Sequence, residues 1–496
     1  MKKNKKVFFI TSIIIILIIC VAFTSKELQN DTFYTIKVGE SIIKKGIDMK
    51  DHFSWHNLPY TYPHWLYDIL IYKIYNKFNF NGLYMFSILT FIVIGISFYL
   101  INLKLNKSYF LSLLFSIFAL IMIAKNVTAR AQLLTYLFFI LEVFFIEKLL
   151  STGKKKYIVF LLLDCLLIAN IHSAVWPFYF VLIIPYLFEE LIYLINKKIK
   201  YKEEKSIFPK KLIIEHNKNI KLLILVFTIS LIIGLLTPIF PEPYTYFIKI
   251  MQGDSMEYIQ EHQPLVLITN VFVIAYFLML LVPLILTKVK IKLSDFAMIS
   301  GLLLMSFLSI RHISLLSIIG VFYLCRLISN IGLINSKKQM DFDVPIYGSV
   351  IVLITTIISS VVVYNINYKE DFVNKENYPV DMVDYIKDNI DTKKMKLFNQ
   401  YDFGSYLIYR DLKVFIDSRC DLYTKPFNHK EDIFDEAMTI SENYGRTFNK
   451  YDITHILIYN DTKDYLNQIL NASSNYKLIR KDGRFSLYEY LKNTEE

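Results

Sequence analysis

Titratable and aromatic side chains gather between Asp31 and Asp68, directly after the first long apolar segment of the chain. The groups with potential chemistry there are Asp31, Glu40, Asp48, Asp51, His52, Trp55, His56, His64, Trp65 and Asp68. A carboxylate beside a lipid surface can take the proton of an acceptor hydroxyl or hold a divalent cation. Because this stretch is longer than a simple connection requires, it is a candidate functional site.

Further polar side chains stand at the ends of later apolar segments. They are Arg130 and Gln132, Asn170 and His172, Lys249 and Glu261 in the 240–265 loop, and Arg311 and His312. Arginine, lysine and histidine stabilise the charge of a phosphate that leaves during a transfer reaction. If these ends meet at one membrane face, they suit a reaction in which a lipid phosphate leaves. Asp31 is then the first candidate for a general base or metal ligand, and Glu261 is a second carboxylate.

The carboxylates also have purely structural interpretations, which stay open at this level. Asp31 fits a solvated loop acid or the cap of a helix over 32–45. Asp48 and Asp51 fit turn formers after Gly46.

The other candidate side chains are equally ambiguous. His64 suits either a ligand or an ordinary histidine at the membrane interface. Trp55 and Trp65 suit stacking on a sugar or anchoring in the interface. An arginine at the end of a span, such as Arg130 or Arg311, reaches toward water unless it pairs with an anion such as a phosphate.

Apolar segments dominate the chain, which is 54% hydrophobic with a mean hydropathy of +0.39. Apolar runs of roughly 17–22 residues predict membrane-spanning helices. We expect eleven, at 7–23, 82–103, 108–124, 132–150, 157–171, 174–195, 220–239, 266–287, 296–310, 312–333 and 346–365. The net charge of +11 does not indicate nucleic-acid binding, because the lysines cluster in short loops. The four scattered cysteines indicate neither a disulfide framework nor a zinc site.

The lysines alternate between successive loops and so predict the topology. Lysine-rich loops lie at 104–107, 154–156, 196–219, 288–292 and 337–338. By the positive-inside rule these loops and the N-terminus face the cytoplasm. The first loop, 24–81, and everything after residue 365 then lie outside. The amphipathic segment 64–78 is expected to lie along the outer interface.

Residues 366–496 predict a separate extracytoplasmic α/β domain beside a transmembrane domain over 1–365. Turn residues return here, and short apolar runs alternate with amphipathic ones. We expect strands at 413–418, 454–460, 476–480 and 485–490, and helices at 380–390 and 430–445. The predicted fold class is a mainly α polytopic membrane protein with a C-terminal α/β domain.

Elements spread over most of the chain resemble those of a bacterial polytopic membrane-protein family. They are Asp31-Thr-Phe-Tyr, Gly39, Ile42 to Gly46, Asp51-His-Phe-Ser-Trp55, Trp65-Leu66, Arg130-Ala-Gln132, Asn170-Ile-His172, the EHQP element with Glu261, Arg311-His312, and the segments 398–409 and 414–423. The family resembles lipid-carrier-dependent glycosyltransferases of the GT-C type. The resemblance implies a GT-C-like helical domain and a polyprenyl-phosphate sugar donor.

A more distant resemblance is to the catalytic subunit of oligosaccharyltransferases. In that subunit a first-loop Asp serves metal binding or catalysis and a later outer-loop Glu precedes a QP-like element, and Asp31 and Glu261 match these in kind. A WWDYG-type motif binds the acceptor peptide there. The QYDFG element at 400–404 matches that motif only in Asp402 and Gly404, so recognition of a peptide sequon is not expected.

The residues and the resemblance together predict a glycosyltransferase of the cell membrane. It would transfer a sugar from a polyprenyl-phosphate donor in the lipid to a glycan, lipid or protein acceptor on the outer face. Asp31 and Glu261 would be catalytic, and Asp31 would also be the candidate ligand for Mg²⁺ or Mn²⁺. The donor phosphate would contact Arg130, His172, Arg311 and His312. The acceptor or sugar would contact Asp51, Trp55, His64, Trp65 and Asp402.

Two other functions fit the sequence less well. One is a non-catalytic scaffold for envelope assembly with an outer sensing domain. The other is a transporter of lipid-linked sugars, which should place charges within its spans. The acids inside apolar runs are few and fall singly or toward the inner ends: Glu142, Glu147, Asp164, Glu189 and Glu190.

Overall fold

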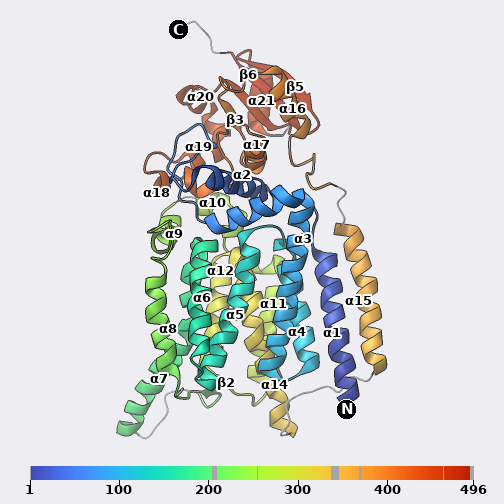
Figure 1. Cartoon of the computed structure of the whole chain (residues 1–496), viewed down its shortest axis with the longest axis vertical. Helices are drawn as coiled ribbons and strands as arrows, with labels where there is room; N and C mark the ends of the chain where they lie inside the picture. The colour runs from blue at the N-terminus through green and yellow to red at the C-terminus, as the bar shows by residue number, and fades with distance from the viewer. Residues whose placement is uncertain are drawn as a thin grey trace. The chain divides into compact units, whose positions relative to one another are not determined.

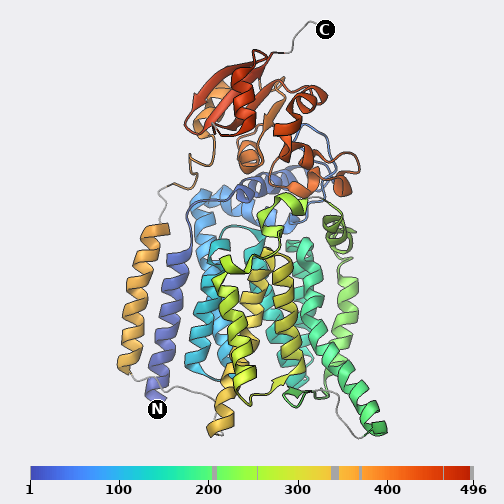
Figure 2. The ribbon, with the colours of Figure 1, turned by 180° about the vertical axis from the view of Figure 1, so that it is seen from behind.

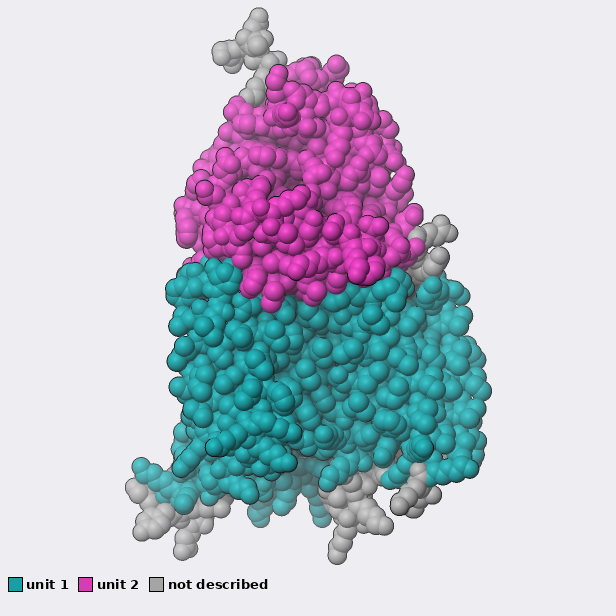
Figure 3. All heavy atoms as spheres, viewed as in Figure 1, with its two compact units in different colours: residues 1–25, 84–243, 260–368 teal, residues 26–83, 244–259, 369–496 magenta. Residues whose placement is uncertain are grey.

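The apolar runs of the sequence form long helices in the computed structural model, which describes residues 2–203, 209–253, 255–336, 346–367, 371–461 and 463–491. The chain divides into two units, which Figure 3 colours separately. The first, here called the helical unit, comprises residues 1–25, 84–243 and 260–368. The second, the mixed unit, comprises 26–83, 244–259 and 369–496. The mixed unit therefore combines the C-terminal segment with most of the first predicted loop.

A helix lies in each of the eleven segments predicted to span the membrane (Figures 1 and 2). These helices are α1 (Lys2–Phe23), α3 (Trp65–Asn106), α4 (Tyr109–Ile123), α5 (Ala131–Thr152), α6 (Lys156–Ile171), α7 (Trp176–Glu203), α8 (Ile220–Ile233), α11 (Val271–Leu286), α12 (Leu293–Leu308), α14 (Val321–Ser336) and α15 (Ile346–Asn367). Among the described residues, six helical segments are long and apolar enough to cross a membrane: Lys3–Phe23, Trp65–Asn106, Tyr109–Asn126, Ser173–Lys198, Ile310–Ile331 and Ile346–Ile366. The prediction of a mainly helical, multi-pass membrane protein is confirmed.

The outer surface of the helical unit is apolar, as a lipid environment requires. Val271, Leu304 and Ile358 each expose about two thirds of their side chains, at 68%, 60% and 61%. Helices satisfy their own backbone hydrogen bonds, so such side chains can face hydrocarbon without cost. At one edge of the unit α1 packs beside α15 (Figures 1 and 2).

Short turns stand at the ends of these helices, and two of them carry Glu261, Arg311 and His312. The turns are η1 (Ala124–Asn126), η2 (Ser173–Val175), η3 (Gln260–His262), η4 (Leu267–Thr269), η5 (Ile310–His312), α13 (Ile313–Leu315) and η6 (Leu316–Gly320). A two-residue parallel pair, β1 (Leu212–Ile213) with β2 (Ile291–Lys292), ties two loops of the unit together.

The mixed unit is built on a four-stranded sheet with the strand order β3-β4-β6-β5. Its strands are β3 (Leu397–Asn399), β4 (His455–Tyr459), β5 (Tyr476–Asp482) and β6 (Phe485–Tyr490). β3 and β4 are parallel, and the other two pairings are antiparallel. The helices are α2 (Asn30–Lys45), α9 (Glu242–Met251), α10 (Ser255–Tyr258), α16 (Val380–Asn389), α17 (Tyr401–Tyr409), α18 (Lys425–Asn428), α19 (Ile433–Met438), α20 (Ile440–Lys450) and α21 (Tyr465–Ala472).

Residues of the first predicted loop are part of the core of the mixed unit. Leu28 and Phe33 are buried in the same cluster as Met382, Leu407 and Leu487. The Phe33 ring meets the Tyr378 and Tyr406 rings edge-on, with centroids 5.0 and 5.3 Å away. The first part of α3 also belongs to this unit, and Asn79, with φ 52° and ψ −154°, breaks that helix. The loop is therefore a folded element rather than a connection.

Most of the predicted elements of the C-terminal segment are confirmed, with two corrections. Strands β4, β5 and β6 and helix α16 lie where the sequence predicts them. The predicted helix over 430–445 is instead two helices, α19 and α20.

The predicted strand over 413–418 is wrong. Val414 makes one isolated bridge, to Ser54, and the strand of the sheet is β3 instead. The reason is the Asn399 side chain, which makes the hydrogen bonds to this segment that the backbone of a neighbouring strand would otherwise make. Its Oδ1 accepts from the Phe415 amide at 2.9 Å, and its Nδ2 donates to the Ile416 carbonyl at 2.8 Å.

Candidate functional site

The turns η3 and η5 of the helical unit lie against each other, held by backbone contacts. The Ile310 amide donates to the Gln263 carbonyl at 3.0 Å, and the Leu265 amide donates to the Phe307 carbonyl at 3.1 Å. The Ser309 hydroxyl donates to the Glu261 carbonyl at 3.0 Å. Two segments far apart in the sequence, both predicted to carry site residues, therefore meet.

Arg130 and Glu261 form an ion pair within the helical unit. Arg130 precedes the first residue of α5 in extended conformation, and its Nη1 lies 3.6 Å from Glu261 Oε1. The Glu261 side chain is 47% exposed and the Arg130 side chain 21%, so the carboxylate remains open to a ligand. Arg130 and Glu261, which are distant in sequence, are therefore in contact.

Arg311 pairs with a neutral histidine. Its Nη1 donates to His262 Nε2 at 3.1 Å, so this ring nitrogen is an acceptor and carries no proton. Burial, reinforced by the charges of Arg311 and His312, lowers the pKa of His262 to about 4. Among the described residues no carboxylate pairs with Arg311, so its positive charge is not compensated by a side chain.

The two histidines predicted to bind the donor phosphate have different surroundings. The His312 ring lies 5.4 Å from the Phe178 ring, and its Nδ1 donates to the Met305 carbonyl at 3.0 Å. His172 is 3% exposed, and its Nδ1 lies 2.9 Å from the Thr135 hydroxyl of α5. His172 therefore links the end of α6 to α5.

We call Arg130, Glu261, His262, Arg311 and His312 the junction cluster. It presents two guanidinium groups and one exposed carboxylate at the ends of membrane-length helices. Each guanidinium has five N–H donors in a planar fork that matches phosphate. The cluster can therefore bind an anion through the arginines and hold a carboxylate next to it.

In the mixed unit, Asp31 and Asp402 stand in the first turns of two packed helices, α2 and α17. Nδ2 of the Asn30 side chain donates to the Tyr401 carbonyl at 3.2 Å and joins the two helix starts. Burial raises the pKa of Tyr378, and the negative charges of both Asp31 and Asp402 raise it further. Partial desolvation raises the pKa of Asp402 itself. The structure therefore brings these two predicted carboxylates to one region.

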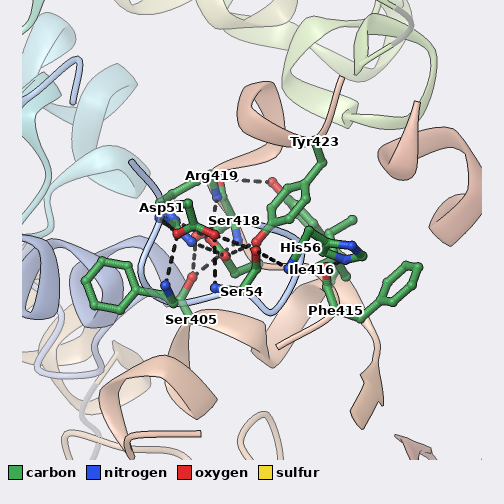
Figure 4. A network of polar contacts seen from close by, with 12 residues as sticks. Asp51, Ser54, His56, Ser405, Phe415, Ile416, Ser418, Arg419 and Tyr423 are labelled. Carbon is green, nitrogen blue, oxygen red and sulfur yellow. Dashed lines mark hydrogen bonds and ion pairs between the residues drawn. The ribbon is translucent and has the colours of Figure 1, made fainter. Parts of the chain in front are cut away.

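Asp51, predicted to contact acceptor or sugar, lies in a buried polar network (Figure 4). Arg419 Nη1 donates to Asp51 Oδ1 at 2.8 Å, and the side chains of Arg419 and Asp51 are 2% and 0% exposed. Asp417 receives two hydrogen bonds from the same guanidinium, at 2.8 and 2.7 Å. The Tyr423 hydroxyl donates to Asp417, and the Ser54 hydroxyl donates to Asp51.

Arg419 is the counter-ion of both carboxylates in this network. Burial alone would raise the pKa of Asp51, but the positive charge of Arg419 and hydrogen bonds from Ser54 and Phe53 outweigh it and hold the pKa below its usual value. Burial also raises the pKa of Tyr423 well above the usual value, and the charge of Asp417 adds to this. One guanidinium held by two carboxylates in a closed interior is a folding element. Asp51 faces no open surface in this arrangement.

The predicted aromatic and histidine contacts have structural partners as well. The Trp55 indole donates to the Leu397 carbonyl at 3.2 Å, and the His56 ring beside it donates to the Phe415 carbonyl at 2.9 Å. His64 is half-buried, just before α3. Trp65 is the first residue of α3, and its indole N–H is buried without a hydrogen-bond partner among the described residues.

The described residues do not form a ready-made metal centre. No three His, Cys, Asp or Glu side chains among them group closely enough to hold an ion. Asp31 and Asp402 are two carboxylates in one region, and Mg²⁺ or Mn²⁺ takes more oxygen ligands than these supply. The residues present therefore do not fit a protein-built cation site, and we derive no step through one.

Reasoning from the sequence missed three residues that the structure places in these clusters. His262 accepts from Arg311, and Asp417 with Arg419 forms the centre of the buried network. The sequence could have indicated these residues, because His262 lies in the EHQP element and Asp417 and Arg419 lie in the segment 414–423, both of which carry the family resemblance.

Comparisons with known proteins complete these observations. No family model matches the sequence, and no curated protein matches it. Among solved structures, the chain is similar to the crystal structure of ArnT from Cupriavidus metallidurans bound to undecaprenyl phosphate. The similarity has a TM-score of 0.48 and 10% sequence identity, and it covers 97% of each chain.

Proposed function

We propose that this chain is a membrane glycosyltransferase that moves a sugar from a polyprenyl-phosphate donor to an acceptor on the outer face of the membrane. The observation that carries the proposal is the uncompensated guanidinium of Arg311, paired with neutral His262 beside the Arg130–Glu261 ion pair. A half-buried positive charge without a counter-ion favours binding of an anion. A lipid phosphate is the anion available at the end of a membrane-spanning helix.

In this proposal the cations bind the phosphate of the donor. Arg311 supplies a fork of N–H donors, and Arg130 stands next to Glu261 with the same chemistry. His312 is held in place by the Met305 carbonyl, close to Arg311 in sequence. His172 acts as a positioning residue, because it fastens α6 to α5 through Thr135 just beyond Arg130.

The carboxylates would serve the acceptor. The acceptor hydroxyl oxygen forms a bond to the anomeric carbon of the sugar, and the bond from that carbon to the phosphate oxygen breaks. The phosphate leaves with the electron pair, and the acceptor proton passes to a carboxylate. Asp31 is the proposed general base, and Glu261 is the second carboxylate, which balances the charge that develops on the sugar.

The mixed unit would provide the acceptor contacts. Asp402 is the best placed of the predicted contacts, since it is exposed in the first turn of α17, in the same region as Asp31. Asp51 and Trp55 have structural partners inside the mixed unit, so we assign them to its folding and not to acceptor contacts. His64 and Trp65 lie at the start of α3 and are proposed as sugar contacts.

The experiment that tests this proposal measures lipid binding and transfer separately. The purified chain in detergent is offered a polyprenyl phosphate, and binding is followed by native mass spectrometry. Transfer is followed with a labelled polyprenyl-phosphate sugar, with EDTA and added Mg²⁺ or Mn²⁺ as parallel conditions. Saturable binding that requires Arg311, together with transfer that requires Asp31, supports the enzyme. Absence of both in a folded preparation contradicts it and favours a scaffold.

A further inference from the structure

Two carboxylic side chains face the interior of the helical unit between neighbouring helices. Glu142 lies near the middle of α5, and Asp164 lies near the middle of α6. The helices are consecutive and antiparallel, and they pack along their length (Figures 1 and 2). Glu142 is 0% exposed and Asp164 4%. The Asp164 carboxyl group is close enough to act electrostatically on the Glu142 carboxyl group.

These carboxyl groups are largely without hydrogen-bond partners. Both oxygens of Glu142 and Oδ2 of Asp164 are buried without a hydrogen bond among the described residues. The contrast with another buried acid in the same unit is direct. Arg326 donates to Asp295 at 2.9 Å and lies 3.1 Å from Glu147. Asp295 and Glu147 share a cation, whereas no ion pair is found for Glu142 or Asp164 among the described residues.

Polar but uncharged side chains surround the pair among the described residues. The charges of Glu142 and Asp164 act electrostatically on two titratable groups nearby, the Tyr179 hydroxyl of α7 and the Cys165 thiol of α6. The Ser230 hydroxyl of α8 lies 3.5 Å from the Tyr179 hydroxyl, and the Trp176 indole donates to the Cys165 sulfur at 3.2 Å. Glu142 is influenced by burial and by the charge of Asp164, and Asp164 by burial; no Lys, Arg or His of the described chain acts on either carboxyl group.

Physical chemistry restricts what such a pair can bind. A carboxylate between membrane helices is costly unless it is paired, and two like charges side by side add repulsion. A metal ion needs several ligands, and no three His, Cys, Asp or Glu side chains group closely enough to hold one among the described residues. A proton needs only one carboxyl oxygen, and it removes the charge outright.

We propose that Glu142 and Asp164 form a proton-binding site between α5 and α6, separate from the glycosyl-transfer site. In the arrangement described here both carboxyl groups are protonated. Loss of a proton leaves an unpaired charge between two packed helices, so it favours a rearrangement that brings water or a cation to the pair. α5 also carries Thr135, whose hydroxyl contacts His172, and Arg130 of the junction cluster directly precedes this helix. A movement of α5 therefore also moves Arg130.

Dicyclohexylcarbodiimide tests this proposal, because it reacts with protonated carboxyl groups in apolar surroundings. The carboxyl O–H adds across one C=N bond of the reagent, with no loss of atoms, and the product is found by peptide mass mapping. The full-length protein in detergent is labelled over a range of pH, with and without added Na⁺. Asp295, which is buried, and Glu147, which is half-buried, are the internal control, since both acids have Arg326 as partner.

We expect labelling of Glu142 or Asp164 at neutral pH to exceed that of the control acids by about tenfold, because only unpaired buried acids stay protonated. Labelling should fall as the pH rises. Glu142→Gln should confine it to Asp164, and Glu142→Gln with Asp164→Asn should remove it from the α5–α6 region.

Three results would overturn the proposal. One is equal labelling of the control acids. Another is strong protection by Na⁺ at constant pH, which would indicate a metal cation as the ligand. The third is absence of labelling in native protein together with an unchanged infrared band of protonated carboxyl groups in Glu142→Gln. The native protein decides the question even if a variant fails to fold.

Discussion

Arg419 Nη1 donates a hydrogen bond to Asp51 Oδ1 at 2.8 Å and joins the first polar stretch of the chain to its C-terminal segment inside the mixed unit. Both side chains are enclosed, and Asp417 holds the other side of the same guanidinium. The stretch after the first span is therefore folded onto the sheet-bearing segment. Asp31 and Asp402 come to one region as a consequence of the same packing.

Removal of one partner of this buried ion pair should destabilise the mixed unit. Asp51→Asn removes one of the two carboxylates that hold Arg419 and leaves Asp417 in place, so the cost of about 3–5 kcal/mol for breaking a buried pair is an upper bound. Thermal unfolding of the purified protein, followed by proteolysis within 26–83, measures this. Lys375→Ala removes an exposed pair with Asp381 and should change little. If Asp51→Asn were as stable as the native protein, the network would not contribute to the stability of the mixed unit.

Asp31→Asn should lower glycosyl transfer without unfolding the protein. The change keeps the size of the side chain and removes its charge, and general acid–base groups contribute roughly 10²–10⁴-fold to rate. Glu261→Gln should show a smaller loss, since it removes a supporting charge. A labelled polyprenyl-phosphate sugar in detergent measures the rate. Full activity of Asp31→Asn at matched expression excludes Asp31 from the mechanism, and full activity of both variants argues for a non-catalytic scaffold.

Arg311→Ala should weaken binding of a polyprenyl phosphate by about 10- to 100-fold, which corresponds to one charge-assisted hydrogen-bonded contact. Arg311→Lys should restore part of the affinity, because it returns the charge without the planar fork. Native mass spectrometry with increasing lipid measures the change. Arg484→Ala, at an exposed turn of the mixed unit, is the control and should bind as the native protein does. If Arg311→Ala bound the lipid normally, the phosphate contact would lie elsewhere.

Acid should destabilise the mixed unit through His56. Burial among aromatic rings, together with the charges of Lys396 and Lys450, outweighs the Phe415 carbonyl and lowers the pKa of His56 to about 4. The unfolded chain therefore binds more protons between about pH 6.5 and 4, so stability falls as the pH drops through this window.

The expected loss from this histidine is on the order of 2 kcal/mol. His56→Gln keeps a donor for the Phe415 carbonyl and cannot be protonated, so its unfolding temperature should depend less on pH in the same window. His429→Gln, at an exposed position, is the control. An unchanged pH profile in His56→Gln would assign the acid sensitivity to another group.

The positions of the helices followed from local sequence. Hydropathy over one helix length is a property of consecutive residues, so the eleven predicted segments coincide with helices. The same holds for β4, whose apolar run from Ile456 to Tyr459 is continuous. The strand expected over 413–418 failed because the Asn399 side chain, distant in sequence, takes the hydrogen bonds of Phe415 and Ile416.

By itself the sequence determined which residue types stand at the ends of the spans, including Arg130, Glu261 and Arg311. Only the tertiary structure decided their partners. Whether Arg311 meets a carboxylate or the neutral ring of His262 depends on how η3 docks on η5, and no local pattern encodes that. Burial likewise depends on packing, and burial separates Asp51, closed into an ion pair, from Asp31 at the start of its helix.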